Sequence, residues 1–507
     1  MTVAMYKRHP IGPAKKSVAF AGWRAIATMN VWLMFVAAPD LHAHLALRGS
    51  APAADGSLHA APTSIQLSFT EPVELALSSV ILTGPDGQIV LLGELATVEA
   101  RDVITAPITG QLKAGTYTVA WQAVGRDGHP VQGEFAFVIE EGATGLAPPV
   151  EEIPVGEPID MEPTAVPAAE LPSFNPQSPL YAAVRWLGYV GILGSLGAIG
   201  FAVLLSAPRL RSDAVTPSFR EAAAAGAASL GIFSALLLGF SLPLRLQAQA
   251  HSLFGGGVTR ERFGLLLDST WGLAWVAQAV GAALLLGGLI LARRGVRPGW
   301  LLAGIGAIGL AAAPGLSGHA AAVERLRGVA VTADALHILG VGAWLGTLVV
   351  LQAVGVPLAR KQPQDVRGEL LGRLLNAFSP LALLAAGVVL GTGVLASFLH
   401  LSAPSDLWAS AYGRVLAAKV LLVLSVMAFG AFNWRRVGPR AAEPGADRRL
   451  MKSAGAELAT AVVIVALTAV LVALPAPGHS ETAATPVAGT PSAGGDLDAA
   501  VDLAGQP

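Results

Sequence analysis

Three residues near the start of the chain carry groups that bind divalent metal ions. His44 follows a stretch that predicts a cleavable signal peptide, and cleavage after Ala43 leaves a free α-amine beside the His44 imidazole. These two nitrogens can chelate one ion and suit Cu(II) better than other divalent metals. Asp127 and His129 stand two residues apart after a predicted strand, so they point to the same side and add a carboxylate oxygen and a second imidazole.

Each of these features has a plainer interpretation. The sequence Asp127-Gly128-His129-Pro130 is also ordinary turn chemistry, and residues 1–43 also fit an uncleaved amino-terminal anchor. His59 lies in a polar loop and is not assigned to metal. The chain has no cysteine, which removes disulfides, thiolate metal sites and cysteine nucleophiles together.

A second set of ionisable residues falls inside long apolar stretches, where exposure to lipid is costly and a functional role is the default expectation. Asp334 and His337 stand three residues apart, on one face of a predicted helix. A structural pair that holds neighbouring helices together is the alternative. Lys419 and Glu457 also lie in such stretches, and either can pair or reach the membrane surface through its long side chain.

The elements that position the first set are short strands. Residues 44–142 alternate between apolar and polar positions in six runs separated by turn sequences, which predicts a small all-β sandwich or barrel. The runs are Ser64 to Phe69, Val73 to Thr83, Gln88 to Leu92, Val103 to Ile108, Gly115 to Val124 and Gly133 to Ile139. Residues 143–177 are rich in Pro and Glu and predict an extended linker.

The second set is positioned by membrane helices. Of the 507 residues 53% are hydrophobic and 13% charged, with a net charge of −1, which favours a membrane protein and gives no indication of nucleic-acid binding. Residues 178–476 predict a bundle of about eight transmembrane helices, and 477–507 a disordered tail. The apolar stretches are 180–206, 223–247, 263–292, 299–317, 329–354, 376–400, 408–433 and 454–475.

The distribution of basic residues predicts the orientation of this bundle. Arg and Lys concentrate in one alternating set of loops, around 209–220, 293–297, 360–373 and 435–452, while the other set holds far fewer. The first set is therefore expected to be cytoplasmic. This arrangement places the β domain on the extracytoplasmic side of a bacterial inner membrane, where the signal peptide would deliver it.

Several motifs run in order along the β region. They are His44-Leu45-Ala46-Leu47, Ser50-Ala51-Pro52, Asp55-Gly56, Phe69-Thr70-Glu71-Pro72-Val73-Glu74, Gly115-Thr116-Tyr117-Thr118-Val119-Ala120-Trp121 and Asp127-Gly128-His129-Pro130-Val131. This series resembles CopC, a periplasmic copper-binding family. The resemblance implies a Greek-key, Ig-like β barrel with a Cu(II) site built from His44, Asp127 and His129, and with Glu71 behind these ligands. Some CopC proteins also have a Met-rich Cu(I) site, but residues 44–142 contain no methionine.

Short motifs in the apolar region carry a second resemblance. Ser317-Gly318-His319-Ala320-Ala321, Asp334-Ala335-Leu336-His337 with Trp344-Leu345-Gly346, and Tyr412-Gly413-Arg414 with Lys419 are similar to those of CopD, a family of copper-resistance membrane proteins. The resemblance implies copper movement across the inner membrane. His319, His337, Asp334 and His400 are the candidate relay for the ion.

The leading hypothesis is therefore copper capture by the β domain and transfer into the bundle, for import, homeostasis and resistance, with no enzymatic activity. No phosphate-binding loop followed by Lys-Ser or Lys-Thr is present in the sequence, so ATP-driven pumping is not supported. One alternative is a membrane redox protein that reduces Cu(II) through haem or metal. Another is a copper buffer or sensor that transports nothing. The expected partners are the copper ion, which the metal-binding residues and the resemblance imply, and the lipid bilayer, which the apolar stretches imply. No protein partner is predicted.

Overall fold

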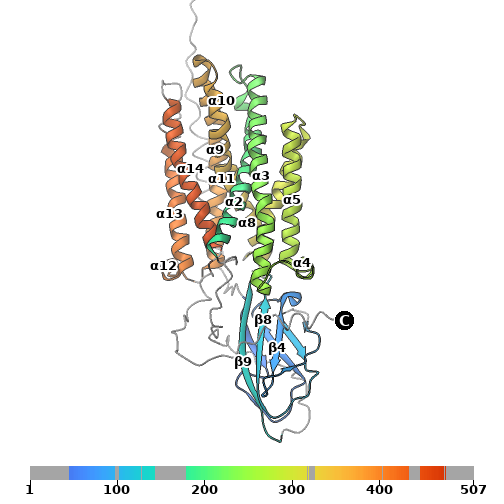
Figure 1. Cartoon of the computed structure of the whole chain (residues 1–507). Coiled ribbons are helices and arrows are strands. Elements are labelled where there is room, and N and C mark those ends of the chain that lie inside the picture. Colours follow the sequence, from blue (N-terminus) through green and yellow to red (C-terminus); the bar gives the residue numbers. More distant parts are fainter. Residues whose placement is uncertain are drawn as a thin grey trace, which may run out of the picture.

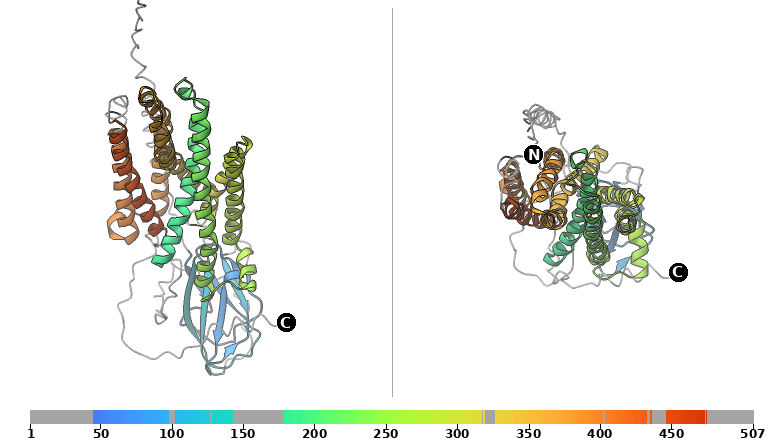
Figure 2. Two further views of the ribbon diagram at one scale, coloured as in Figure 1. Left: turned by 45° about the horizontal axis from the view of Figure 1, so that its top comes forward. Right: turned by 90° about the horizontal axis from the view of Figure 1, so that it is seen from above.

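The computed structural model describes residues 45–97, 102–126, 128–142, 178–316, 318, 326–401, 403–432, 435, 446–472 and 474. Within these ranges a β domain lies at one end of a bundle of long helices (Figure 1). The β domain is under the side of the bundle formed by α3 and α5 (Figure 2). The bundle therefore has one end that faces the β domain and one end that faces away from it.

The β domain is a sandwich of two sheets, with strand orders β1-β3-β7-β6 and β2-β9-β8-β4-β5. β2 and β9 pair in parallel, and the other named pairs are antiparallel. The chain crosses between the sheets from β3 to β4 and from β7 to β8, as Greek-key connections do. The strands are β1 (Leu47–Ala51), β2 (Ser57–Leu58), β3 (Ser64–Phe69), β4 (Ser79–Thr83), β5 (Ile89–Val90), β6 (Ala96–Thr97), β7 (Val103–Pro107), β8 (Gly115–Val124) and β9 (Pro130–Ile139).

The core of the sandwich follows from the alternation of side chains along each strand. On β8, Tyr117, Val119 and Trp121 are buried, and they meet buried residues of the other sheet such as Phe69. Phe69 and Trp121 pack edge to face with ring centroids 5.4 Å apart. The apolar residues whose alternation predicted the strands are thus the residues that are buried in the core.

One predicted strand is partly wrong. The run from Val73 to Thr83 begins with a 3-10 turn, η1 (Leu75–Leu77), and only Ser79–Thr83 is a strand. The reason is tertiary, because Leu77 is buried against residues of the bundle and leaves the plane of the sheet. The strands β1, β2 and β6 lie outside the six predicted runs.

Within the part of the chain that the structure describes, seven helices are long and apolar enough to cross a membrane, and Gly455–Leu471 is a shorter apolar helix, which is consistent with about eight spans. Large apolar side chains such as Phe240, Leu301 and Leu421 are more than half exposed on the bundle, as contact with lipid requires. The helices are α2 (Pro179–Leu205), η2 (Pro208–Leu210), α3 (Pro217–Phe254), α4 (Arg260–Leu267), α5 (Thr270–Arg293), α6 (Pro298–Leu316), α8 (Arg327–Val341), η3 (Gly342–Gly346), α9 (Thr347–Val350), η4 (Leu351–Gly355), α10 (Val356–Arg360), α11 (Gln364–His400), α12 (Asp406–Ala409), α13 (Ala411–Phe432) and α14 (Ala446–Leu471).

The predicted span 263–292 is divided into two helices. α4 ends at Leu267, and α5 starts anew at Thr270, because the Ser269 hydroxyl accepts a hydrogen bond from the Gly272 amide at 3.0 Å and caps the new helix. This break lies at the end of the bundle that faces the β domain (Figure 1). It brings the first turn of α5 against the β domain.

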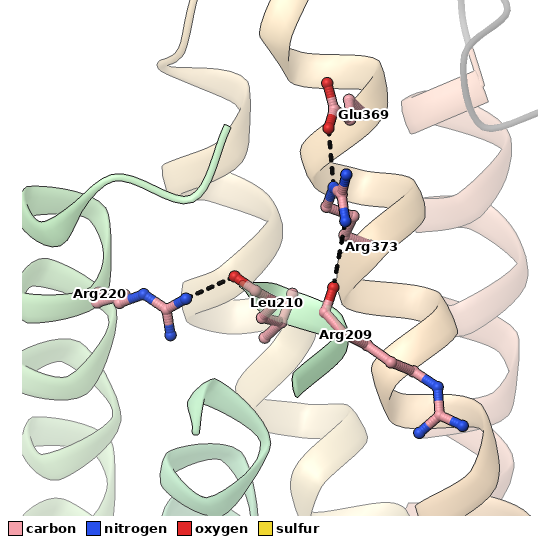
Figure 3. Close-up of polar contacts among 5 residues, drawn as sticks. All are labelled: Arg209, Leu210, Arg220, Glu369 and Arg373. Carbon is pink, nitrogen blue, oxygen red and sulfur yellow. Dashed lines mark hydrogen bonds and ion pairs between the residues drawn. The ribbon is translucent and has the colours of Figure 1, made fainter. Parts of the chain in front are cut away.

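At the end of the bundle that faces away from the β domain, two arginines form hydrogen bonds with backbone carbonyls at the end of α2 and in the loop after it. Arg220 of α3 donates to the carbonyl of Leu205, the last residue of α2, and to the carbonyl of Leu210, the last residue of η2. Figure 3 shows the contact with Leu210. Arg373 of α11 pairs with Glu369 at 2.8 Å and donates to the Arg209 carbonyl at 3.4 Å. These contacts tie the α2–α3 loop to α11.

Candidate metal site and polar layer of the bundle

Three segments that carry predicted site residues meet at the end of the sandwich nearest the bundle. The amide of Ala46 donates to the Thr70 hydroxyl at 2.8 Å, and the amide of Thr70 donates to the Ala46 carbonyl at 2.9 Å. The chain that leaves His44 therefore runs beside the start of the loop containing Glu71. That loop in turn bridges to Gly125 through Val73. The fold brings the first described residues, the Glu71 loop and the turn before His129 together.

His129 and Glu71 are the predicted site residues whose surroundings the structure describes in this domain. His129 is half-buried, and its carbonyl accepts from the Gly125 amide at 3.3 Å. Glu71 is buried. His44 and Asp127 lie outside the described residues, and among the described ones no three His, Asp or Glu side chains form a metal-binding group. The ligand set His44, Asp127 and His129, with Glu71 behind it, therefore stays a prediction.

His59 lies far from this end of the domain. Its imidazole is exposed, and its Nδ1 is 2.7 Å from the carboxylate of Glu140, just after the end of β9. His129 precedes the start of β9, so the ten-residue strand separates the two histidines by about 30 Å. His59 therefore provides a matched control for copper binding.

The loops at the predicted copper site touch the bundle directly. Gln249 of α3 is buried, and its side-chain amide donates to the Gly128 carbonyl at 2.7 Å. The Gln122 amide donates to the Leu253 carbonyl at 3.3 Å, and the Thr270 hydroxyl donates to the Glu74 carboxylate. The two domains are thus joined by specific polar contacts as well as by apolar packing.

The apolar part of this contact is a cluster that includes residues from both domains. Leu77 and Val124 of the β domain are buried with Leu253, Leu266 and Trp271 of the bundle. These side chains come from η1, β8, α3, α4 and α5. The exit from β8, which leads into the turn with His129, is consequently held against the helices.

In the bundle, α8 carries Asp334 and His337 one turn apart. The Asp334 carboxylate points toward α6, since one of its oxygens would lie 3.2 Å from a methyl group added at Gly315. His319 follows Gly315 by four residues in the sequence and lies outside the described residues. Lys419 of α13 interacts electrostatically with both Asp334 and His337. The predicted pair therefore faces at least two other helices.

The hydrogen bonds around His337 favour one tautomer of its imidazole. His337 Nδ1 is 2.9 Å from the Thr392 hydroxyl of α11, and that hydroxyl donates its own hydrogen to the Val388 carbonyl at 2.7 Å. With its hydrogen directed to a carbonyl, the Thr392 hydroxyl is placed to accept from His337, which favours the tautomer with the proton on Nδ1. The lone pair is then on Nε2, in the form in which imidazole binds a metal.

The described bundle histidines lie toward the β-domain end. His251 is in the last turn of α3, with Nδ1 2.9 Å from the Gln247 carbonyl. His400 is the last residue of α11, where the backbone alone is described. His337 is ten residues into its span, which corresponds to about 15 Å from the start. These three histidines therefore lie in the half of the bundle that is nearer to the β domain.

His337 belongs to a layer of polar residues at similar depth, about 10 to 15 Å from the β-domain ends of their helices by the rise of 1.5 Å per residue. We call this set the polar layer: Arg185, Tyr189, Arg245, Gln278, Asp334, His337, Thr392 and Lys419. Arg245 donates to Gln278, and Tyr189 interacts electrostatically with Arg185, Arg245 and Asp334. Asp334 is the one acidic member of this set.

Sequence reasoning missed Arg185 and Arg245. Both lie inside the predicted spans 180–206 and 223–247, and an arginine within an apolar stretch is the signal that identifies them. Gln249 and Trp271 were also missed. No sequence pattern marks these two, because their importance lies in contacts with a domain more than a hundred residues away.

Three protein-family models match successive parts of the chain. The CopC domain matches residues 47–140, the copper resistance protein D-like N-terminal domain matches 176–329, and copper resistance protein D matches 372–471. The fold and these matches define a multi-pass membrane protein that carries a copper-resistance β domain. The chain belongs to the copper-resistance proteins that combine CopC and CopD domains in one polypeptide.

The chain is also similar to individual copper proteins. The copper transport protein CutJ of Bacillus subtilis is 28% identical over 86% of this chain and 75% of its own length. Copper resistance protein C of Escherichia coli is 33% identical over 19% of this chain and 82% of its own length. The crystal structure of PcoC, a methionine-rich copper resistance protein from E. coli, covers 19% of this chain and 100% of its own, with 34% identity and a TM-score of 0.18. The three family matches, together with the sequence similarity to CutJ and to copper resistance protein C, give this chain a copper-related function.

Proposed function

We propose that the β domain binds Cu(II) on the extracytoplasmic side through the amine and imidazole of His44, the Asp127 carboxylate and the His129 imidazole. The ion then passes into the bundle and toward the cytoplasm. The donor set is three nitrogens and a carboxylate, which is the chemistry that Cu(II) prefers. Glu71, buried beside the segment that follows His44, orients the ligands without binding the ion.

One observation carries the transfer step. The loop that contains His129 rests on the bundle at Gln249, with a contact of 2.7 Å, and the described bundle histidines lie toward that same end. An ion that leaves the β domain there is next to the end of the bundle at which these histidines lie. We propose His319, His337, Asp334 and His400 as the relay inside it. His337 supports this role because its contact with Thr392 favours the tautomer with the proton on Nδ1, in which the Nε2 lone pair can bind a metal.

The test for the β-domain site is a competition titration of the purified full-length protein with Cu(II) and a chelator. His129→Ala is expected to weaken Cu(II) binding by more than about tenfold, because one ligand is lost. His59→Ala, at the far end of β9, is the control and should bind like wild type.

A third variant, with one residue added before His44, tests the role of the α-amine, because the added residue moves the amine away from the His44 imidazole. We expect a similar loss of affinity, because the amine then leaves chelating position. Wild-type affinity in both His129→Ala and the extended protein contradicts the proposed ligand set. Sequencing the amino terminus of the mature protein identifies the first residue independently.

A further inference from the structure

We propose that the α3–α5 end of the bundle is a structural part of the copper site, with Gln249, Thr270 and Trp271 as positioning residues for its two loops. This inference rests on the proposed function, since it presupposes copper binding at those loops. It goes beyond that function because it makes copper affinity depend on residues of the membrane domain. Copper binding and docking of the β domain are then linked, and each strengthens the other.

Gln249 fixes the backbone next to His129. Its amide donates to the carbonyl of Gly128, which belongs to the peptide group that leads directly into His129. Rotation of this peptide group would break the hydrogen bond and move the imidazole. Gln249 is itself buried, so the bond has no competition from bulk water and its loss would leave a buried amide without that acceptor.

Trp271 determines which residue can stand at position 128. Gly128 has a φ of +79°, a conformation that favours glycine, and a methyl group there would lie 2.8 Å from Cδ1 of the Trp271 ring. The indole therefore packs on the backbone of the loop itself. Trp271 is buried in the apolar cluster between the domains, which holds its ring in place.

The same turn of α5 also holds the second loop. The Thr270 hydroxyl donates to the carboxylate of Glu74, three residues after Glu71, and the Glu74 amide donates to the Val124 carbonyl at 2.7 Å. Two adjacent residues of one helix thus contact both loops. The relative position of Glu71 and the turn with His129 is set partly by the bundle, because neither loop can shift without breaking a contact to it.

The apolar and the polar contacts between the two domains have different roles: the apolar contacts hold the β domain on the bundle, and the polar contacts fix its orientation. Burial of Leu77, Val124 and Leu253 supplies a non-directional attraction that would tolerate small rotations of the β domain. The hydrogen bonds of Gln249 and Thr270 require one particular orientation, because hydrogen bonds weaken steeply when bent or lengthened. The polar contacts therefore select the docked orientation in which the loops are aligned.

The test compares Gln249→Ala with Gln247→Ala in the full-length protein. Gln247 is the same residue type on the same helix, but its side chain contacts His251 and Val258 within the bundle. Gln249→Ala is expected to weaken Cu(II) binding about five- to tenfold, the equivalent of one hydrogen bond, and to change the Cu(II) electron paramagnetic resonance spectrum. Gln247→Ala should leave both unchanged. Thr270→Val should act in the same direction as Gln249→Ala.

The effect of Cu(II) on the bundle can also be measured, and this second measurement does not rely on a single variant. Hydrogen exchange in the last turns of α3 should slow when Cu(II) binds to the wild-type protein, and this effect should disappear in Thr270→Val or Gln249→Ala. Equal affinities in all variants, or exchange that Cu(II) does not change, overturns the inference while the copper site itself stands. A wild-type protein that binds no Cu(II) overturns the proposed function instead.

Discussion

At the scale of single residues, the chemistry of the bundle depends on how each ionisable group is held. His337 is fixed by a threonine of another helix, whose own hydrogen is committed to a backbone carbonyl. This arrangement orients one imidazole nitrogen and leaves the other with a lone pair. Asp334 interacts electrostatically with Lys419 of α13, so the two side chains belong to the same polar layer.

Copper uptake by proteoliposomes tests the role of His337. We expect His337→Ala to lose most of the uptake, and Thr392→Val to lose about tenfold because the ring is no longer oriented. Thr332→Val is the control, since Thr332 is an exposed residue of α8 whose hydroxyl donates to the Gly328 carbonyl in the preceding turn of the same helix. Uptake by His337→Ala equal to that of wild type would exclude this residue from the relay.

At the scale of elements, the helix that carries Asp334 and His337 is positioned by close backbone contact. After α8 the helix widens into the π-helical segment η3, and Gly346 there packs against Gly197 of α2. A methyl group at Gly346 would lie 2.2 Å from the Leu193 carbonyl oxygen. Small residues at such crossings let membrane helices approach, and the approach brings α8 against α2.

Gly346→Ala is therefore expected to lower the thermal unfolding midpoint of the detergent-solubilised protein, because backbone atoms cannot move aside cheaply. Gly309→Ala on α6 is the matched control, since an added methyl group there meets nothing within 4 Å. That change should leave the midpoint unchanged or raise it slightly through helix propensity. A midpoint equal to wild type in Gly346→Ala would contradict tight packing of α2 on η3.

At the scale of the whole molecule, the arrangement of domains determines what an ion can reach. The β domain sits under the α3–α5 side of the bundle (Figure 1). The contacts of Arg220 and Arg373 lie at the other end, because Arg220 is in the first turn of α3, and the last turn of that helix faces the β domain. The excess of basic residues in the loops at that other end favours its cytoplasmic location. Copper would then arrive from outside at the β domain.

Orientation can be measured by labelling, because the chain has no cysteine of its own. Ser57→Cys introduces an exposed thiol in the β domain, and Glu221→Cys introduces one near the start of α3, at the opposite end. A membrane-impermeant maleimide should label Ser57→Cys in spheroplasts and Glu221→Cys only after permeabilisation. The reverse pattern would place the β domain in the cytoplasm and contradict import from outside.

The sequence by itself determined the division into a β domain and a helical membrane region. Alternation of apolar residues located strands such as Ser64–Phe69 and Gly115–Val124 with the bounds they have, because local periodicity decides which side chains are buried. Long apolar stretches located the helices for the same reason. The motif around His129 and the pair Asp334 and His337 were also visible, since their spacing is local.

Tertiary structure alone decided what these residues contact. The 3-10 turn at Leu75–Leu77, the break between α4 and α5, and the hydrogen bond from Gln249 to Gly128 all arise where the β domain meets the bundle. The partner of His337 is 55 residues away, and Arg185 and Arg245 join the polar layer through helices that pack side by side. Such contacts depend on how elements distant in the chain pack, and no periodicity within one segment encodes them.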